Sequence, residues 1–328
     1  MDVPTFTNAD LKKLIIPLFL EQLLLASVGI ADVFVVGFVG ESAVSGVSLI
    51  NSFNTIFLNL FVARATGGAV AISQYIGRKD REQAAASASQ LLTASVLMSV
   101  VVAILVLIFN RPLLGLMFGK VEDSVMDACV NCLCISAYSY PMLAIYNAGA
   151  ALYRSFGKTS TTMYISIVPN SVNVVGNCIG VFLLHAGVEG VAWPSLISRT
   201  LSAVLITMFC FSENNPVQYM RSWIFKIDGE LQKKILRIAV PNGIESGLFQ
   251  LVKVALSSIA ALFGTYQIAA DGVAQSIWTM AALVSVSMGP ACSRSSDSAW
   301  ERATSNRQSS ASGSSRRSRL PSRLAGTS

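Results

Sequence analysis

Two acidic side chains interrupt the first long apolar stretch of the chain. Glu21 and Asp32 lie within residues 14–37, where most other side chains are aliphatic or aromatic. On an α-helix this separation places the two carboxylates about 20° apart around the axis and about 16 Å apart along it. A carboxylate within a membrane is energetically costly, so we expect the face that carries both acids to contact protein or water rather than lipid.

Three asparagines form a second polar stripe, within residues 161–184. Asn170, Asn173 and Asn177 stand at positions i, i+3 and i+7, which is one face of a helix. Their amides can join neighbouring helices by hydrogen bonds. They can equally supply carbonyl oxygens to a cation together with Asp32, because hard cations such as Na⁺ favour several oxygen ligands. The sequence leaves both interpretations open.

An arginine lies inside the second apolar stretch. Arg64 is followed by residues 66–69, a patch of small side chains that permits close approach of another helix. One interpretation is an interfacial arginine whose side chain extends toward the cytoplasm. The other is a counter-charge for Asp32 or Glu245 across a cavity.

Long apolar stretches must position these polar groups. Hydrophobic residues make up 53% of the chain and charged residues 13%, about half the share that is usual in soluble proteins. Apolar stretches of at least about 18 residues recur, which predicts that the chain crosses a bilayer many times. We expect membrane-spanning helices at residues 14–37, 46–72, 88–109, 126–152, 161–184, 189–211, 236–263 and 267–292.

The first and seventh of these helices begin alike. Residues 16–21 (Ile-Pro-Leu-Phe-Leu-Glu) recur as residues 240–245 (Val-Pro-Asn-Gly-Ile-Glu), so Glu245 occupies the position of Glu21. A chain of two similar halves can rock one half against the other around a central cavity, as many secondary transporters do. We expect Glu21, Arg64 and Glu245 to line such a cavity, where a carboxylate attracts cations or exchanges protons.

Basic residues gather in alternate loops, and the positive-inside rule therefore places the N-terminus in the cytoplasm. The net charge of +6 follows from this topology and the basic tail, so we expect no nucleic-acid partner. The basic residues of these loops are Lys12, Lys13, Arg78, Lys79, Arg81, Arg154, Lys158, Arg221, Lys226, Lys233, Lys234 and Arg237.

Cysteine and histidine usage argues against a metal site and against an enzyme. Cys129, Cys132 and Cys134 are close in sequence but have no nearby histidine, so we interpret them as small apolar side chains. His185, the one histidine, lies in an outer loop. A membrane enzyme would need a cluster of acids, histidine or a nucleophile at a membrane face. We expect no enzyme, no cofactor and no metal site.

In this order and spacing, the motifs resemble those of the multidrug and toxic compound extrusion (MATE) family of cation-coupled exporters over about residues 10–293. The motifs that carry the resemblance are Pro17 with Asp32–Gly37, Thr66–Gly68 with Ser73–Asp80, Tyr153–Thr159, and Asn173 and Asn177 followed by Gly187–Ala192.

The resemblance implies twelve helices in two six-helix lobes, with Na⁺ or H⁺ entering as an organic cation leaves. It implies that Asp32, Asn173 and Ser195 belong to a cation site in the first lobe, and that Glu245 matches an acid of the second. Asn177, which we include in the site, is a departure, because many bacterial members carry an aspartate there. One carboxylate fewer weakens Na⁺ binding, whereas proton coupling through Asp32 or Glu245 is less affected.

The expected function is therefore secondary active export of organic cations or drugs by antiport against H⁺ or Na⁺. We expect a monomeric, multi-pass protein of the bacterial inner (cell) membrane. One alternative is a flippase for lipid-linked precursors, which would favour a cavity lined with arginines. The other is a nonfunctional remnant, because alternating access needs both lobes.

The composition changes abruptly after Cys292 to serine, arginine and glycine. The resemblance expects a second copy of the loop Gln74–Ala84 here. Read in another frame, with G or C preferred at most free third bases of the codons, Asp297–Gln308 becomes Gly-Gln-Arg-Leu-Gly-Ala-Gly-Asp-Ile-Glu-Pro-Ala, which matches that loop in residue type. We interpret the tail as frameshifted translation; the alternative is a genuine basic, disordered tail that attracts anionic lipids.

These expectations describe an all-α polytopic membrane protein in four segments. Residues 1–212 form a complete N-terminal six-helix lobe, and residues 213–235 a cytoplasmic linker. Residues 236–292 form the first two helices of a second, repeated but incomplete lobe. Residues 293–328 form a disordered tail.

Resequencing the gene around codon 293 tests the frameshift. We expect the nucleotides to encode the loop motif in the alternative frame. An intact reading frame whose nucleotides do not encode that motif would contradict the interpretation and leave the basic tail as the genuine sequence.

Overall fold

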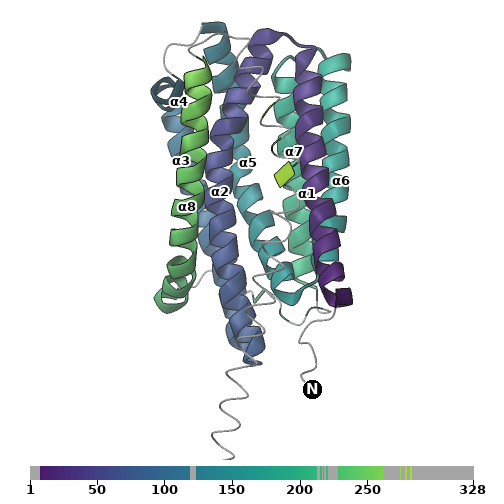
Figure 1. Cartoon of the computed structure of the whole chain (residues 1–328), viewed down its shortest axis with the longest axis vertical. Helices are drawn as coiled ribbons and strands as arrows, with labels where there is room; N and C mark the ends of the chain where they lie inside the picture. Colours follow the sequence, from purple (N-terminus) through teal and green to yellow (C-terminus); the bar gives the residue numbers. More distant parts are fainter. Residues whose placement is uncertain are drawn as a thin grey trace, which may run out of the picture.

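The computed structural model describes residues 8–118, 123–212, 215, 217, 219–220, 228–261, 274, 278 and 281–282. Within these residues the fold is all-α, as predicted, and the long helices stand side by side along one axis (Figure 1). The helices are α1 (Asn8–Gly37), α2 (Glu41–Gly77), α3 (Arg81–Ile108), α4 (Asn110–Phe118), α5 (Asp123–Phe156), α6 (Thr159–Cys178), continued by the π-helical turn η1 (Ile179–Leu183), α7 (Glu189–Cys210) and α8 (Gly229–Ala261).

Six helices of the described part are long and apolar enough to cross a membrane: α1, α2, α3, α5, α6 with η1, and α7. They confirm the first six predicted spans. The helix α8 forms where the seventh was expected but is not among the six. Its charged residues, which include Lys233, Lys234, Arg237 and Glu245, lower its hydropathy.

Other parts of the prediction fall at or beyond the edges of the described residues. The eighth span, 267–292, lies outside them except at residues 274, 278, 281 and 282, which are helical. The tail 293–328 also lies outside them, as do residues 213–214, 216, 218 and 221–227 of the linker 213–235. The short helix α4 was not predicted, because a helix of 9 residues is too short for a span and carries Arg111 and Pro112 in its first turn.

The packing order places α1 against α6, and α2 against both α5 and α8. In Figure 1, α1 and α6 accordingly lie on one side of the bundle and α2 and α8 on the other. The helix α5 contacts α2, α3 and α7, so it joins the two sides. The consecutive helices α1 and α2 contact each other much less than either contacts its main partner.

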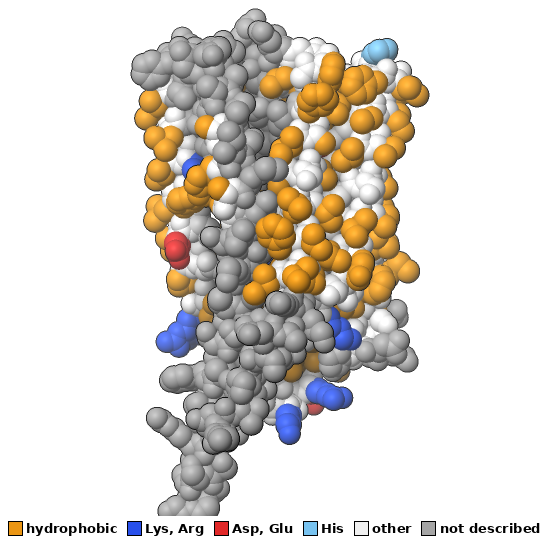
Figure 2. All heavy atoms as spheres, turned by 45° about the vertical axis from the view of Figure 1, so that its right-hand side comes forward, with side chains coloured by type: hydrophobic (Ala, Val, Ile, Leu, Met, Phe, Trp, Pro, Cys, Tyr) orange, Lys and Arg blue, Asp and Glu red, His pale blue; other side chains and the backbone are white. Residues whose placement is uncertain are grey.

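Charge and hydrophobicity separate along the bundle axis. Figure 2 shows apolar side chains covering most of the described surface of this face, with most basic side chains at the lower end and the histidine at the upper end. The lower end is also where α1 begins (Figure 1). The basic loops thus gather at one end of the molecule, as the loop pattern predicted. A broad apolar band of this kind is the surface of a multi-pass membrane protein.

The contact between the end of α6 and the start of α7 depends on two glycines. A methyl group at Gly180 in η1 would overlap the backbone carbonyl of Gly190, and one at Gly190 would meet the backbone of Gly180 at 2.8 Å. The two helices therefore approach with backbone against backbone, which only glycine permits at such a separation.

We expect Gly180→Ala to destabilise the bundle by about 1–3 kcal/mol, the usual cost of overpacking. The measurement is the midpoint of thermal unfolding in detergent. Gly29→Ala is the matched control, because a methyl there meets no atom within 4 Å; it should not lower the midpoint, since alanine favours a helix more than glycine does. Equal midpoints for both variants would contradict this account of the contact.

Candidate functional site

Asp32 on α1 faces α6, as the shared face of the two acids predicted. Asn177 donates a hydrogen bond from Nδ2 to Asp32 Oδ1. The same nitrogen also donates to Asn173 Oδ1, at 3.3 Å. Asn177 is 1% exposed and Asn173 4%. Burial of these amides makes their hydrogen bonds necessary, because an unpaired amide inside the protein costs free energy.

The chain of hydrogen bonds continues from α6 to α7. Asn173 Nδ2 donates to Ser195 Oγ at 3.0 Å. The structure therefore brings all four predicted coupling residues together across three helices. The third asparagine of the stripe, Asn170, does not join them, and its Nδ2 has no hydrogen-bond partner within the described part of the chain.

A small cavity of about 50 Å³ lies beside this chain of hydrogen bonds. It has room for a few water molecules but is far smaller than the pockets that hold drug-sized ligands, which measure about 300–1,000 Å³. Its lining residues come from α1, α2, α5 and α7 and the loop before α7: Asp32, Val47, Asn51, Asn54, Cys132, Ser136, Val188, Val191, Ala192, Ser195 and Arg199.

Arg199 is the residue of this site that sequence reasoning missed. It lines the cavity and lies close enough to Asp32 for the two charges to interact. Its Nη1 donates to Ser139 Oγ on α5 at 2.6 Å. A signal was present in the sequence, because Arg199 follows Ser195 by four residues and therefore lies on the same face of α7.

Glu21 lies in a closed hydrogen-bond network rather than at the cavity. Its carboxylate, which is 1% exposed, accepts hydrogen bonds from Tyr146 at 3.1 Å, from Arg154 at 3.2 Å and from Thr162 at 3.0 Å. These partners come from α5 and α6, so Glu21 fastens α1 to both helices. Three protein donors thus bind the buried carboxylate, and its expected place in a substrate cavity stays a prediction.

Arg64 is buried as well, but its hydrogen-bond partner is the amide of a glutamine and not a carboxylate. Its Nη2 donates to Gln232 Oε1 at 2.7 Å, and Gln232 donates in turn to the backbone and side-chain oxygens of Gln90 at 3.1 Å. This network joins α2, α8 and α3. The expected pairing of Arg64 with Asp32 or Glu245 is absent from the described part of the chain, and so is the expected snorkelling, because Arg64 is 8% exposed.

Glu245 differs from Glu21 despite their equivalent positions in the repeat. It lies exposed on α8 and makes no hydrogen bond or ion pair with the described residues. The two glutamates therefore have unrelated surroundings. Their equivalent positions in the repeat are therefore not evidence that Glu21 and Glu245 line one cavity. The hypothesis of a coupling site rests on Asp32.

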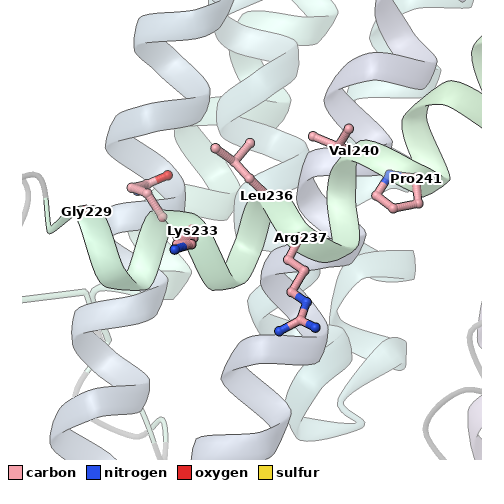
Figure 3. Close-up of a pocket in the computed structure, with 7 residues that line it drawn as sticks. Gly229, Lys233, Leu236, Arg237, Val240 and Pro241 are labelled. Atoms are coloured by element: carbon pink, nitrogen blue, oxygen red, sulfur yellow. The ribbon is translucent and has the colours of Figure 1, made fainter.

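A wider hollow of about 550 Å³ lies along α8 and contains none of the predicted site residues. Figure 3 shows Leu236 and Val240 pointing to one side of this helix and Arg237 to the other. The residues around it all belong to α8: Gly229, Gln232, Lys233, Leu236, Arg237, Val240 and Pro241. An open hollow along one helix does not gather polar groups from several elements as the Asp32 cavity does.

Comparison with known proteins gives the family. The sequence model of the MatE family matches residues 17–179, which contain Asp32, Asn173 and Asn177. The chain belongs to the MATE family. It is 26% identical over 267 residues to the uncharacterized transporter YisQ of Bacillus subtilis, and 26% identical over 289 residues to the probable multidrug resistance protein YoeA of the same organism.

Solved structures show the same fold. An outward-facing multidrug resistance MATE family transporter of the MOP superfamily superposes with a TM-score of 0.81 at 21% identity, over 89% of this chain and 64% of that one. A MOP superfamily transporter from Pyrococcus furiosus superposes with a TM-score of 0.78 at 20% identity. The matches to YisQ and YoeA cover 80% and 85% of this chain, but the chain spans only 58% and 61% of their lengths.

The different surroundings of the two glutamates predict different effects of one substitution. We expect Glu21→Gln to lower the free energy of unfolding by about 1–3 kcal/mol, because it leaves Arg154 without its charge partner. Glu245→Gln should change it by less than about 0.5 kcal/mol, as is usual for exposed residues. Thermal unfolding of both purified variants in detergent measures this, and equal effects would contradict the placement of either residue.

Proposed function

We propose that this MATE family chain serves secondary active export of drug-like organic cations by antiport against H⁺ or Na⁺. In this proposal Asp32 carries the coupling charge, and Asn173, Asn177 and Ser195 hold it in place. The observation that supports the proposal most is the hydrogen-bonded connection from Asp32 through both asparagines to Ser195, beside a small cavity.

The size of the cavity separates coupling from substrate binding. About 50 Å³ accommodates water or a small ion but no drug-sized molecule. A carboxylate that gains or loses a cation there changes the charge that holds α1 against α6 and α7. Such a local change of charge is the kind of event that can shift a protein between two arrangements of its helices.

The names of the relatives support drugs as the substrate class. YoeA is described as a probable multidrug resistance protein, and MepA of Staphylococcus haemolyticus, 23% identical over 262 residues, as a multidrug export protein. We propose an organic cation because the family resemblance implies that one leaves as H⁺ or Na⁺ enters. We also propose that the chain acts as a monomer in the bacterial cell membrane. Its N-terminus would lie in the cytoplasm, since basic side chains gather at the end where α1 begins (Figures 1 and 2).

One observation bears on the flippase alternative. A flippase for lipid-linked precursors needs several positive charges around a large cavity, to hold phosphate groups. Arg199 does line the Asp32 cavity, but it faces a carboxylate of opposite charge, and Arg64 lies outside that cavity. This arrangement favours the exporter.

Ethidium efflux from cells that express the chain tests the proposal. We expect Asp32→Asn to lower the rate of efflux at least about tenfold, because the coupling charge is lost. Asp127→Asn is the matched control, since Asp127 forms an exposed ion pair with Arg111, and its efflux should equal that of the unchanged chain. A frame-restored gene is tested alongside with the same substitutions.

The outcomes separate the alternatives. Efflux that survives Asp32→Asn at equal amounts of protein in the membrane contradicts the coupling role. Efflux by the frame-restored protein alone identifies the present chain as a remnant. Absence of efflux from both contradicts the exporter.

A further inference from the structure

The cavity beside Asp32 contains a positive charge that belongs to the protein itself. Of the residues that line the cavity, Asp32 and Arg199 are the charged ones. Their charges interact, yet they form no direct ion pair, since the ion pairs within the described part of the chain are Arg111–Asp127 and Arg154–Glu21. The guanidinium and the carboxylate therefore balance each other across the cavity.

Contacts on α5 hold Arg199 in this position. Its Nη1 donates to Ser139 Oγ at 2.6 Å, and Ser139, which is 1% exposed, donates to the backbone oxygen of Ser136 at 2.6 Å. Ser136 also lines the cavity. A guanidinium anchored in this way keeps its charge at the site and cannot readily move aside for another cation.

The two asparagines of the site donate from their amide nitrogens, and one of these nitrogens binds the carboxylate. Asn177 uses Nδ2 toward Asp32, and Asn173 uses Nδ2 toward Ser195. A Na⁺ ion instead needs several oxygen atoms around it. One such atom, Asn177 Oδ1, is buried and has no hydrogen-bond partner within the described residues.

We propose that Arg199 takes the place of a metal cation at this site, so that the chain does not bind Na⁺ at Asp32. This rests on the proposed function and narrows it, because it removes Na⁺ from the two coupling ions. A second cation in the cavity would find the charge of Asp32 already balanced and would be repelled by the guanidinium. Two like charges that share one cavity of this size repel each other, which weakens binding at least about tenfold.

The same geometry predicts what removal of Arg199 creates. The Asp32 carboxylate, Asn177 Oδ1 and Ser195 Oγ are oxygen ligands of the type that Na⁺ accepts. Without the guanidinium, the negative charge of Asp32 is unbalanced, and a cation of the right size can compensate it. Loss of one arginine should therefore give the chain a Na⁺ site.

Na⁺ binding to the purified full chain in detergent tests this directly. The shift of the thermal unfolding midpoint is measured in NaCl and in choline chloride at equal ionic strength. We expect no Na⁺-specific shift for the unchanged chain. Arg199→Gln should show a saturable shift, with a Kd for Na⁺ at least about tenfold lower than any that the unchanged chain shows. The double variant Arg199→Gln with Asp32→Asn should show no such shift.

Two controls complete the experiment. Arg111→Gln removes an exposed arginine from an ion pair and should behave like the unchanged chain. Arg199→Lys keeps the positive charge and should also bind no Na⁺. If Arg199→Gln does not fold, Arg199→Met replaces it, and if neither folds, the titration of the unchanged chain decides.

Saturable Na⁺ binding by the unchanged chain that disappears in Asp32→Asn overturns the proposal. A folded Arg199→Gln protein without Na⁺ binding overturns it as well. The measurement involves no transport, so a failure of drug efflux contradicts the proposed function without changing the outcome of this test.

Discussion

The need to compensate the carboxylate of Asp32 governs how three helices of this bundle meet. An acid among apolar helices requires donors and opposite charge within reach, because no bulk water is there to supply them. Asn177 supplies the donor from α6, and Arg199 supplies the charge from α7. Asn173 and Ser195 then join α6 to α7. Any break in this series leaves a buried polar group without a partner, which costs more than the net value of a single hydrogen bond.

Glu21 acts in the same way farther along α1. Its partners Tyr146, Arg154 and Thr162 lie on α5 and α6, so the two acids of α1 fix that helix to α6 at two separate places. This explains why α1 packs mainly on α6 although α2 follows it directly in the chain. On the other side of the bundle, the hydrogen bonds of Arg64, Gln232 and Gln90 join α2, α8 and α3 in the same way.

The parts of this arrangement that follow from local sequence were predictable. Hydropathy identified six membrane spans, because the length of an apolar stretch is a property of the stretch itself. Helical spacing placed Asn173 and Asn177 on one face, and the family resemblance added Ser195. What failed depended on neighbours that the sequence does not name. The repeat made Glu21 and Glu245 equivalent in sequence, but burial depends on which helices pack around each residue.

The balance of charges within the bundle limits what the described part can attract. Glu21 pairs with Arg154, Asp32 faces Arg199, and Arg64 donates a hydrogen bond to the amide oxygen of Gln232. Neither acid on α1 is thus left as an unbalanced negative charge for an organic cation. The Asp32 cavity is also too small for such a molecule.

In the proposed exporter, the groups that compensate the charge of Asp32 are therefore distinct from those that bind a substrate. A cationic substrate would need negative partners other than Glu21 and Asp32. In the exporter that we propose, a change at Asp32 would act through the contacts of α1 with α6 and α7, rather than by direct competition of substrate and ion for one carboxylate.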